Sequence, residues 1–297
     1  MPRSRRVKVS HKRQMAHPKT RMGQLDSKHI HTASGRRRSD AFTCVVPAVP
    51  LAVVEEILLN LPAQQVVQVC RLVCPEWKEL VDSAAHWKER CRREGIQPCD
   101  ASRPPKDWCQ FYFITKKRRN LIKNHKADEK FAGWTIVHNG GDNWKSEENR
   151  KPFPDVTVTK CFVTSYGLCL KQQLIDLQRE GYSAAFMDQV QPHIKISDWY
   201  GPRFDCGCKY QICVELLDQK KEPIDTFQPE KVVFEQWNDE PWCQMTHVFK
   251  DYGPGVRFIS FTHGGRDTQF WAGHYGIRIT NSSVEICPAA EKESFPA

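Results

Sequence analysis

The spacing of apolar residues changes near residue 110, and this change restricts the fold more than any other feature of the chain. Before it, apolar residues recur every three or four positions, which is typical of one helix face. Three such stripes follow one another: Val54, Ile57, Leu58 and Leu61; Val66, Val69, Cys70 and Val73; Trp77, Leu80, Val81 and Ala84. Pro50, Pro62 and Pro75 lie near their starts, where a missing N–H is tolerated. This part of the chain is predicted to form short helices.

After residue 110 the apolar pattern has a period of two, which is typical of half-buried strands. Residues 210–216 alternate most clearly. Strands are predicted around Val156, Val158 and Phe162; Ile194, Ile196 and Trp199; Tyr210, Ile212, Val214 and Leu216; Cys243, Met245, His247 and Phe249; Val256, Phe258 and Ser260; Val284 and Ile286. Leu168–Leu177 is predicted as a helical interruption. Many short strands separated by Gly and Pro favour an antiparallel β-sandwich, so the chain is predicted to be an α+β multidomain protein.

The positive charge of the chain is concentrated at its N-terminus. Residues 1–38 carry twelve Lys or Arg against one acidic residue, which leaves a formal charge of −2 for the remainder of a chain whose total is +9. This segment has few large apolar residues, so we expect a disordered tail. Its arginine runs are candidate nuclear signals, although charge runs are more often simply solvated. A nucleic-acid partner is not expected for the globular part.

Four further features of the sequence concern cellular location, thiol state and metals. Ala41–Val54 resembles part of a secretory signal, but it starts late and contains two prolines, so we expect a cytoplasmic protein. No apolar run reaches the length of a membrane span. Thirteen cysteines, an odd number, fit reduced thiols better than a disulfide framework. Cys206, Cys208 and Cys213 lack the spacing of a zinc site, so no metal or cofactor is expected.

Phe270 and Trp271 are adjacent in a segment that glycines bracket: Gly264 and Gly265 on one side and Gly273 on the other. A strand would point the two rings to opposite faces, whereas a loop can present both together. Aromatic faces beside polar side chains suit a sugar, which has an apolar patch of C–H groups and a rim of hydroxyls. The alternative is that Trp271 folds back onto the sheet, as most tryptophans do.

The helical segment resembles an F-box. The resemblance rests on Val49-Pro50-Leu51, Glu55-Glu56-Ile57-Leu58, Leu61-Pro62, Cys70-Arg71-Leu72-Val73-Cys74, Glu76 to Asp82 and His86-Trp87. Val49 and His86 depart from the usual pattern, which has Leu at both positions. The resemblance implies binding to the adaptor subunit of an SCF-type ubiquitin ligase and, through it, to the cullin and RING subunits. The residues that it implies for adaptor binding are Pro50, Leu51, Ile57, Leu58, Leu61, Pro62, Val73, Cys74 and Trp77.

The second half resembles the F-box-associated domain of the sugar-recognising F-box proteins. The landmarks include Gly140-Gly141-Asp142, Phe162 to Tyr166, Glu180-Gly181-Tyr182, Asp205 to Cys208, Gln236-Trp237-Asn238, Asp251 to Arg257, His263 to His274 and Thr280 to Ser283. The resemblance implies a jelly-roll-like sandwich of about ten strands. It also implies binding of the di-N-acetylglucosamine core of high-mannose N-glycans through loops at one end. The residues that it implies for glycan binding are Tyr166, Asp205, Phe270, Trp271 and Ala272.

Ala272 stands where one class of relatives has Lys, and Phe270 where several members have Tyr, so the affinity for glycans or the preference among them can differ from theirs.

The expected boundaries are a tail over 1–46, the F-box over 47–92, a linker over 93–118, the glycan-binding sandwich over 119–288 and a short tail over 289–297. The expected function is a non-catalytic substrate receptor for N-glycosylated clients. One alternative is an F-box protein that recognises an unmodified polypeptide. The other is a glycoside hydrolase, for which Asp205 and Asp267 are the candidate carboxylates.

Overall fold

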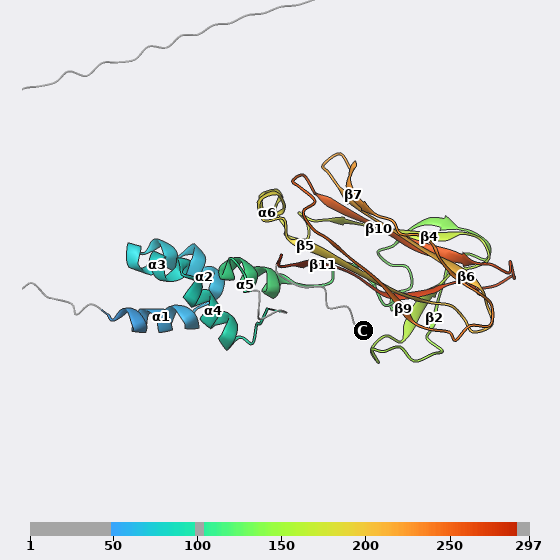
Figure 1. The fold of residues 1–297 in the computed structure, drawn as a ribbon, viewed down its shortest axis with the longest axis horizontal. Helices are drawn as coiled ribbons and strands as arrows, with labels where there is room; N and C mark the ends of the chain where they lie inside the picture. The colour runs from blue at the N-terminus through green and yellow to red at the C-terminus, as the bar shows by residue number, and fades with distance from the viewer. Residues whose placement is uncertain (1–48, 99–103, 290–297) are drawn as a thin grey trace, which may run out of the picture. The chain divides into compact units, whose positions relative to one another are not determined.

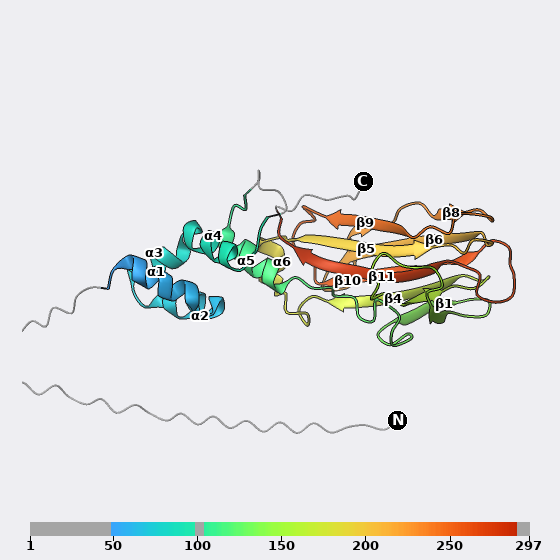
Figure 2. The same ribbon diagram turned by 90° about the horizontal axis from the view of Figure 1, so that it is seen from below.

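The computed structural model describes residues 49–98 and 104–289. Nearly all of the expected N-terminal and C-terminal tails lies outside the described residues, so the disorder expected of the basic tail stays a prediction. Within the described part, a group of short helices is followed by a sandwich of two antiparallel sheets (Figures 1 and 2). The predicted fold class is therefore confirmed.

Proline and a serine cap set the boundaries of the first helices. The helices are α1 (Leu51–Asn60), α2 (Ala63–Gln68), the 3₁₀ turn η1 (Cys70–Leu72), α3 (Pro75–Asp82) and α4 (Ala84–Arg93). Pro50 and Pro62 cap α1 and α2, and Pro75 is the first residue of α3, as the sequence predicts. The third apolar stripe is divided between two helices, because the Ser83 hydroxyl accepts a hydrogen bond from the His86 N–H (3.2 Å) and starts α4.

Helix α5 (Trp108–Lys117) lies in the segment that was expected to be a linker. Its Tyr112 and Phe113 rings pack against Trp87 of α4, with ring centroids 5.4 and 5.3 Å apart. These side chains belong to one buried cluster: Val54, Leu58, Val66, Cys70, Val81, Trp87, Cys91, Phe111 and Tyr112. The helical domain is thus larger than the stripes indicated, because α5 adds Phe111 and Tyr112 to the core that Trp87 and the aliphatic residues of the earlier helices begin.

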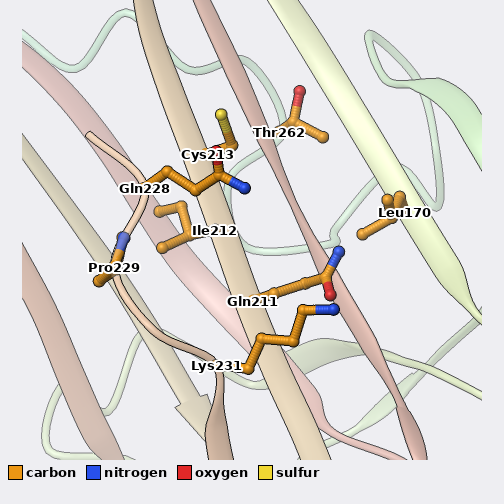
Figure 3. Close-up of a pocket in the computed structure, with 8 residues that line it drawn as sticks. All are labelled: Leu170, Gln211, Ile212, Cys213, Gln228, Pro229, Lys231 and Thr262. Atoms are coloured by element: carbon orange, nitrogen blue, oxygen red, sulfur yellow. The ribbon is translucent and has the colours of Figure 1, made fainter. Parts of the chain in front are cut away.

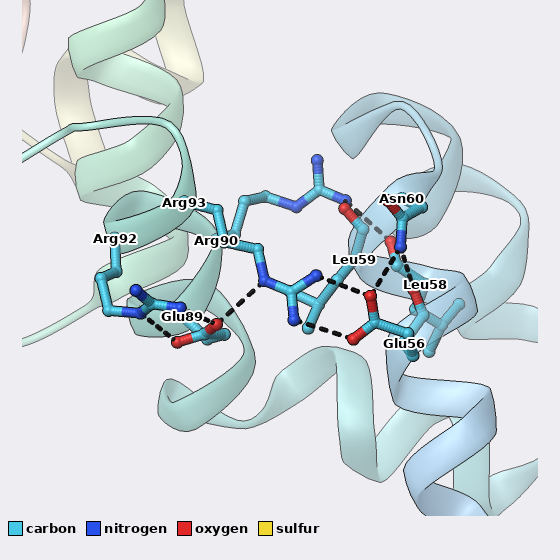
Figure 4. Close-up of polar contacts among 8 residues, drawn as sticks. All are labelled: Glu56, Leu58, Leu59, Asn60, Glu89, Arg90, Arg92 and Arg93. Atoms are coloured by element: carbon cyan, nitrogen blue, oxygen red, sulfur yellow. Dashed lines mark hydrogen bonds and ion pairs between the residues drawn. The ribbon is translucent and has the colours of Figure 1, made fainter.

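Two arginines of α4 hold α1 in place (Figure 4). The buried Arg90 donates hydrogen bonds to the carbonyl oxygens of Leu58 (2.8 Å) and Leu61 (2.7 Å). At this end of α1 helical hydrogen bonding is incomplete, and the Leu58 oxygen has only a long contact (3.4 Å) with the Leu61 N–H. Arg93 forms a bidentate ion pair with Glu56, with both N–O distances 2.8 Å. The C-terminal end of α1 is therefore fixed by backbone contacts as well as by packing.

The sandwich contains eleven strands and one helix among the described residues. They are β1 (Thr135–Asn139), β2 (Lys145–Glu148), β3 (Lys160–Val163), β4 (Cys169–Asp176), α6 (Ala184–Gln189), β5 (His193–Gly201), β6 (Cys208–Leu217), β7 (Pro223–Phe227), β8 (Val232–Phe234), β9 (Cys243–Phe249), β10 (Phe258–Asp267) and β11 (Arg278–Cys287). One sheet has the order β1-β4-β10-β6-β7, with β8 also paired to β6. The other has the order β2-β3-β11-β5-β9. Figure 2 shows the long strands side by side.

The helical interruption predicted at Leu168–Leu177 is wrong, since this segment is strand β4. Its inward positions include Lys171 and Gln173, which are buried among apolar neighbours. Two polar residues on the buried face hide the alternation that identifies a strand. Strand β4 then takes a central place, because it pairs with both β1 and β10.

The strand predicted around Val156 begins later than expected. Val156 is 88% exposed, and β3 starts only at Lys160. The Asp155 carboxylate accepts hydrogen bonds from the Thr157 N–H (2.9 Å) and hydroxyl (2.7 Å). A local side-chain turn of this kind competes with strand pairing, and its hydrogen bonds replace those of a ladder.

Gly264 and Gly265 were expected in a loop, but they lie in the central strand β10. A Cβ atom at Gly264 would approach the Cys169 carbonyl oxygen to 1.9 Å, and one at Gly265 would approach that of Lys209 to 1.8 Å. Both glycines are therefore required by the close approach of β4 and β6 on either side. The loop begins only after Asp267, where β10 ends.

A buried polar network joins the two sheets through Asp198 of β5. Its carboxylate accepts hydrogen bonds from the Tyr210 hydroxyl of β6 (2.6 Å), the Ser282 hydroxyl of β11 (2.7 Å) and His263 Nδ1 of β10 (2.6 Å). His263 Nε2 lies 2.5 Å from the ammonium nitrogen of Lys171, so the neutral tautomer that donates from Nδ1 fits both contacts. Burial lowers the pKa of His263 to about 4 and that of Lys171 well below its usual value.

We predict that His86 makes the helical domain sensitive to acid. His86 is fully buried, and its two ring nitrogens have no hydrogen-bond partner among the described residues. Burial, aided by the charge of Arg90, lowers its pKa from 6.5 to about 4. The unfolded state therefore takes up a proton first, and stability is lost as the pH falls from 6.5 towards 4.

His86→Leu should remove this loss, which amounts to about 2 kcal/mol at pH 5. The free energy of opening of α1 and α4, from hydrogen exchange at pH 7 and pH 5, measures it. At pH 5 the free energy of opening should be higher in the variant than in the parent chain. His263 in the sandwich responds to acid equally in both chains, so it does not affect the difference between them. An equal response of both chains to pH would contradict the prediction.

Candidate functional site

Five loops meet at one end of the sandwich. They are the connections 140–144, 164–168, 202–207, 235–242 and 268–277. In one sheet the antiparallel registers place the ends of β1 and β10 beside the start of β4, and the ends of β8 and β10 beside the start of β6. In the other sheet the ends of β3 and β5 lie beside the start of β11, and the end of β5 also lies beside the start of β9. Segments far apart in the sequence therefore form one surface.

The structure brings all five residues implied for glycan binding to this end. Tyr166 is partly buried in the β3–β4 loop, and Asp205 is exposed in the β5–β6 loop. Phe270, Trp271 and Ala272 lie in the β10–β11 loop, where Phe270 is 64% and Trp271 42% exposed. The structure therefore confirms that both rings lie in a loop and are exposed, and it does not support the reading of Trp271 as a core residue.

Backbone and side-chain hydrogen bonds hold the aromatic loop at both of its ends. The Asp267 carboxylate accepts from the Phe270 N–H (2.6 Å), and that of Asp142 accepts from the Gly273 N–H (2.5 Å). The Ser165 hydroxyl donates to the Gly273 carbonyl oxygen (2.6 Å). Phe270 has a φ of 61°, in the left-handed region that bulky residues rarely adopt. These contacts stabilise a loop conformation that is locally strained.

The neighbouring β5–β6 loop is attached to the aromatic loop. The Gly207 N–H donates to the Gln269 side-chain oxygen (2.9 Å), and the Thr268 N–H donates to the Gly207 carbonyl oxygen (3.0 Å). Arg203 donates to the His274 carbonyl oxygen (3.0 Å). The segment that carries Asp205 is thus joined to the segment that carries Phe270 and Trp271. No local sequence pattern indicates these contacts, which link residues 61 to 71 positions apart.

Asp267 and Asp205 have different environments. Asp267 is fully buried, burial raises the pKa of its carboxyl, and one of its oxygens has no hydrogen-bond partner among the described residues. The other oxygen holds the Phe270 N–H. Asp205 is exposed. A glycosidase needs two carboxylates that both reach the substrate. Asp267 does not reach the surface, so this pair is unsuited to hydrolysis.

The outer face of the β4-β10-β6 sheet carries a hollow of about 200 Å³ (Figure 3). Its lining is an even mixture of polar and apolar side chains: Leu170, Gln211, Ile212, Cys213, Gln228, Pro229, Lys231 and Thr262. None of the residues implied for glycan binding lines it. Among the residues that the structure describes, no group of three or more His, Cys, Asp or Glu side chains could hold a metal ion.

The residues implied for adaptor binding fall into three groups. Pro50, Leu51, Ile57, Pro62 and Val73 are exposed, while Leu61, Cys74 and Trp77 are partly buried and Leu58 is fully buried. Leu58 therefore belongs to the helical core rather than to the surface. The sequence reasoning missed further exposed apolar residues of the same helices: Val49, Val53, Val69 and Leu72, of which Leu72 is 75% exposed. So much exposed apolar surface indicates a partner.

Comparisons with known proteins agree with both halves of the architecture. The F-box domain family matches residues 48–89, and the F-box associated region family matches residues 112–286. The chain is 47% identical to F-box only protein 6 of Bos taurus, over 80% of this chain and 91% of that protein. It is 46% identical to F-box only protein 44 of Homo sapiens, over 80% of this chain and 95% of that protein.

Bos taurus F-box only protein 2 is 45% identical over 78% of this chain and 80% of its own length. Among solved structures, the sandwich resembles the xylan-binding domain of Paenibacillus barcinonensis Xyn10C, with a TM-score of 0.35 and 14% identity, over 58% of this chain and 97% of that chain. That likeness is too distant to bear on function. No helix among the described residues is long and apolar enough to cross a membrane. The chain belongs to the F-box proteins that carry an F-box associated region.

Proposed function

We propose that the protein is the substrate-recognition subunit of an SCF-type ubiquitin ligase. In this role its sandwich binds the di-N-acetylglucosamine core of high-mannose N-glycans on misfolded glycoproteins, and its F-box binds the adaptor subunit, so that the client is ubiquitinated and degraded. The protein itself is a non-catalytic receptor. The single observation that carries the glycan half is the anchored loop with two exposed aromatic rings, to which the loop that carries the exposed Asp205 carboxylate is hydrogen-bonded.

The loop has the properties that sugar binding requires. Its two rings are exposed without a ligand. Hydrogen bonds that the Asp267 and Asp142 carboxylates accept, and one that the Ser165 hydroxyl donates, fix the backbone that carries the rings. Binding to such a loop loses little conformational entropy, because the loop is already ordered. The Asp205 carboxylate supplies an acceptor for sugar hydroxyl or amide groups at the same end of the sandwich.

The compartment that we propose is the cytoplasm. The described cysteines from Cys70 to Cys243 are free thiols, and ubiquitin ligases act where thiols stay reduced. The rival proposal, a receptor for an unmodified polypeptide, has no comparable support, since an uncharged sugar core explains both the exposed rings and the acceptor beside them. A glycoside hydrolase is less consistent still, because Asp267 is buried under the loop.

The first prediction of this proposal concerns the F-box. Replacing Pro50 and Leu51 together with Ala should weaken capture of the SCF adaptor, because both side chains are exposed apolar residues at the start of α1. The melting temperature should stay unchanged, since neither side chain is in the core. Adaptor capture is measured by co-purification.

Leu174→Ala is the matched control, because Leu174 is a 45% exposed apolar residue of the sandwich. It should leave adaptor capture intact. Undiminished capture by the Pro50 and Leu51 variant would contradict the assignment of this surface. Both variants should bind glycan as the parent chain does.

The second prediction concerns Trp271. Trp271→Ala should lower the affinity for free di-N-acetylglucosamine by roughly thirtyfold or more, the effect of losing a contact worth about 2 kcal/mol. The melting temperature should hardly change, because the side chain is 42% exposed and its removal leaves no core cavity. Isothermal titration with the disaccharide and a melting curve provide the two measurements.

Trp134→Ala provides the contrast within the same domain. Trp134 is only 8% exposed, so its truncation should cost about 3 to 5 kcal/mol of stability. If Trp271→Ala behaves like Trp134→Ala, or if it binds the disaccharide as tightly as the parent chain, Trp271 is a structural residue and the glycan proposal loses its main support.

A further inference from the structure

A second pair of exposed aromatic rings lies at the same end of the sandwich. Phe204 of the β5–β6 loop is 56% exposed, and Trp237 of the β8–β9 loop is 68% exposed. Their ring centroids are 5.8 Å apart and their planes meet at 70°. Neither residue is among those that the resemblance implied for glycan binding. Two large rings that contact each other and remain mostly exposed form a corner with free aromatic faces.

Asn238 fixes the two rings relative to each other. Its backbone N–H donates to the Phe204 carbonyl oxygen (3.0 Å), and its side-chain amide donates to the carbonyl oxygens of Arg203 (3.0 Å) and Glu235 (3.0 Å). Trp237 has a φ of 62°, almost the value found for Phe270. Strained backbone of this kind persists where surrounding contacts enforce it, and it clusters at binding sites.

The second pair is continuous with the aromatic loop. Phe204 lies three residues before Gly207, whose backbone is hydrogen-bonded to Thr268 and Gln269. The backbone path from Phe204 to Phe270 limits their separation to about 25 Å. Asp205 follows Phe204 directly, so this carboxylate belongs to the segment that joins the two pairs. An oligosaccharide can extend over such a distance.

We propose that Phe204 and Trp237 form a second saccharide-binding subsite, which takes a pyranose ring of the glycan beyond the core held at Trp271. This inference rests on the proposed glycan-binding function and extends it. The two pairs then divide one glycan between them, the core at the β10–β11 loop and an outer sugar at the Phe204–Trp237 corner.

The chemistry around the corner favours a sugar over a peptide. The two loops that form the corner carry three exposed acidic residues, Asp205, Glu235 and Asp239, for which the described residues show no ion pair. Carboxylates only accept hydrogen bonds, and every sugar hydroxyl can donate one. A peptide backbone offers one N–H donor per residue beside a carbonyl oxygen that cannot donate, so a sugar supplies more donors in the same space. A neutral polyol with an apolar ring face therefore matches both the rings and their surroundings.

The test compares a short and a long glycan on the full chain. The parent chain, Trp237→Gly, Phe204→Ala and Trp271→Ala are each titrated with free di-N-acetylglucosamine and with a free high-mannose N-glycan. Glycine adopts a φ of 62° without strain, so Trp237→Gly removes the ring and should not lower the melting temperature. Trp237→Tyr keeps an aromatic ring at this position and should bind the high-mannose glycan more tightly than Trp237→Gly does.

Trp237→Gly should weaken binding of the high-mannose glycan roughly tenfold and leave the affinity for the disaccharide within about twofold. Phe204→Ala should show the same selective loss, whereas Trp271→Ala weakens both ligands. An unchanged affinity of Trp237→Gly for the long glycan overturns the subsite but leaves the proposed function standing.

Failure of the parent chain to bind either glycan would instead overturn the proposed function, and the subsite with it. A third probe is a reduced, alkylated glycoprotein whose N-glycan has been removed. If Trp237→Gly loses affinity for this polypeptide and not for the free high-mannose glycan, the corner binds peptide and the saccharide proposal is wrong.

Discussion

Asp198 is buried between the two sheets, and the rest of the sandwich depends on its three hydrogen bonds. The Tyr210 and His263 partners belong to one sheet, and Ser282 belongs with Asp198 to the other. A buried carboxylate is costly unless its partners are complete, so a shift of either sheet would leave it unsatisfied. The network therefore selects one alignment of the sheets over its alternatives.

The same strands carry the candidate site. Strands β5, β6 and β10 contribute to the network, and they also flank the loops that hold Asp205, Phe270 and Trp271. Because the strands are fixed, a few hydrogen bonds from Asp267, Asp142 and Ser165 are enough to hold the aromatic loop in a strained conformation. The candidate site and the buried network that aligns the sheets therefore share the same strands.

The sequence predicted those features that local pattern determines. Alternation identified β6, helical spacing with Pro75 identified α3, and the adjacent rings at 270 and 271 identified an exposed loop. It failed where distant residues decide the outcome. Strand β4 was hidden because Lys171 is buried against His263 of β10 and the Trp134 ring, both distant in the sequence. The anchoring of the aromatic loop was unpredictable, since Asp142 lies more than one hundred residues from the glycine that it binds.

We propose that this one chain connects an N-glycan to a ubiquitin ligase. The most direct measurement is capture of a denatured glycoprotein by the full chain bound to its SCF adaptor, before and after enzymatic removal of the N-glycans. We expect that capture is lost when the glycans are removed, and that free di-N-acetylglucosamine competes with the intact client for binding to the chain. Equal capture of the glycosylated and the deglycosylated client would contradict it.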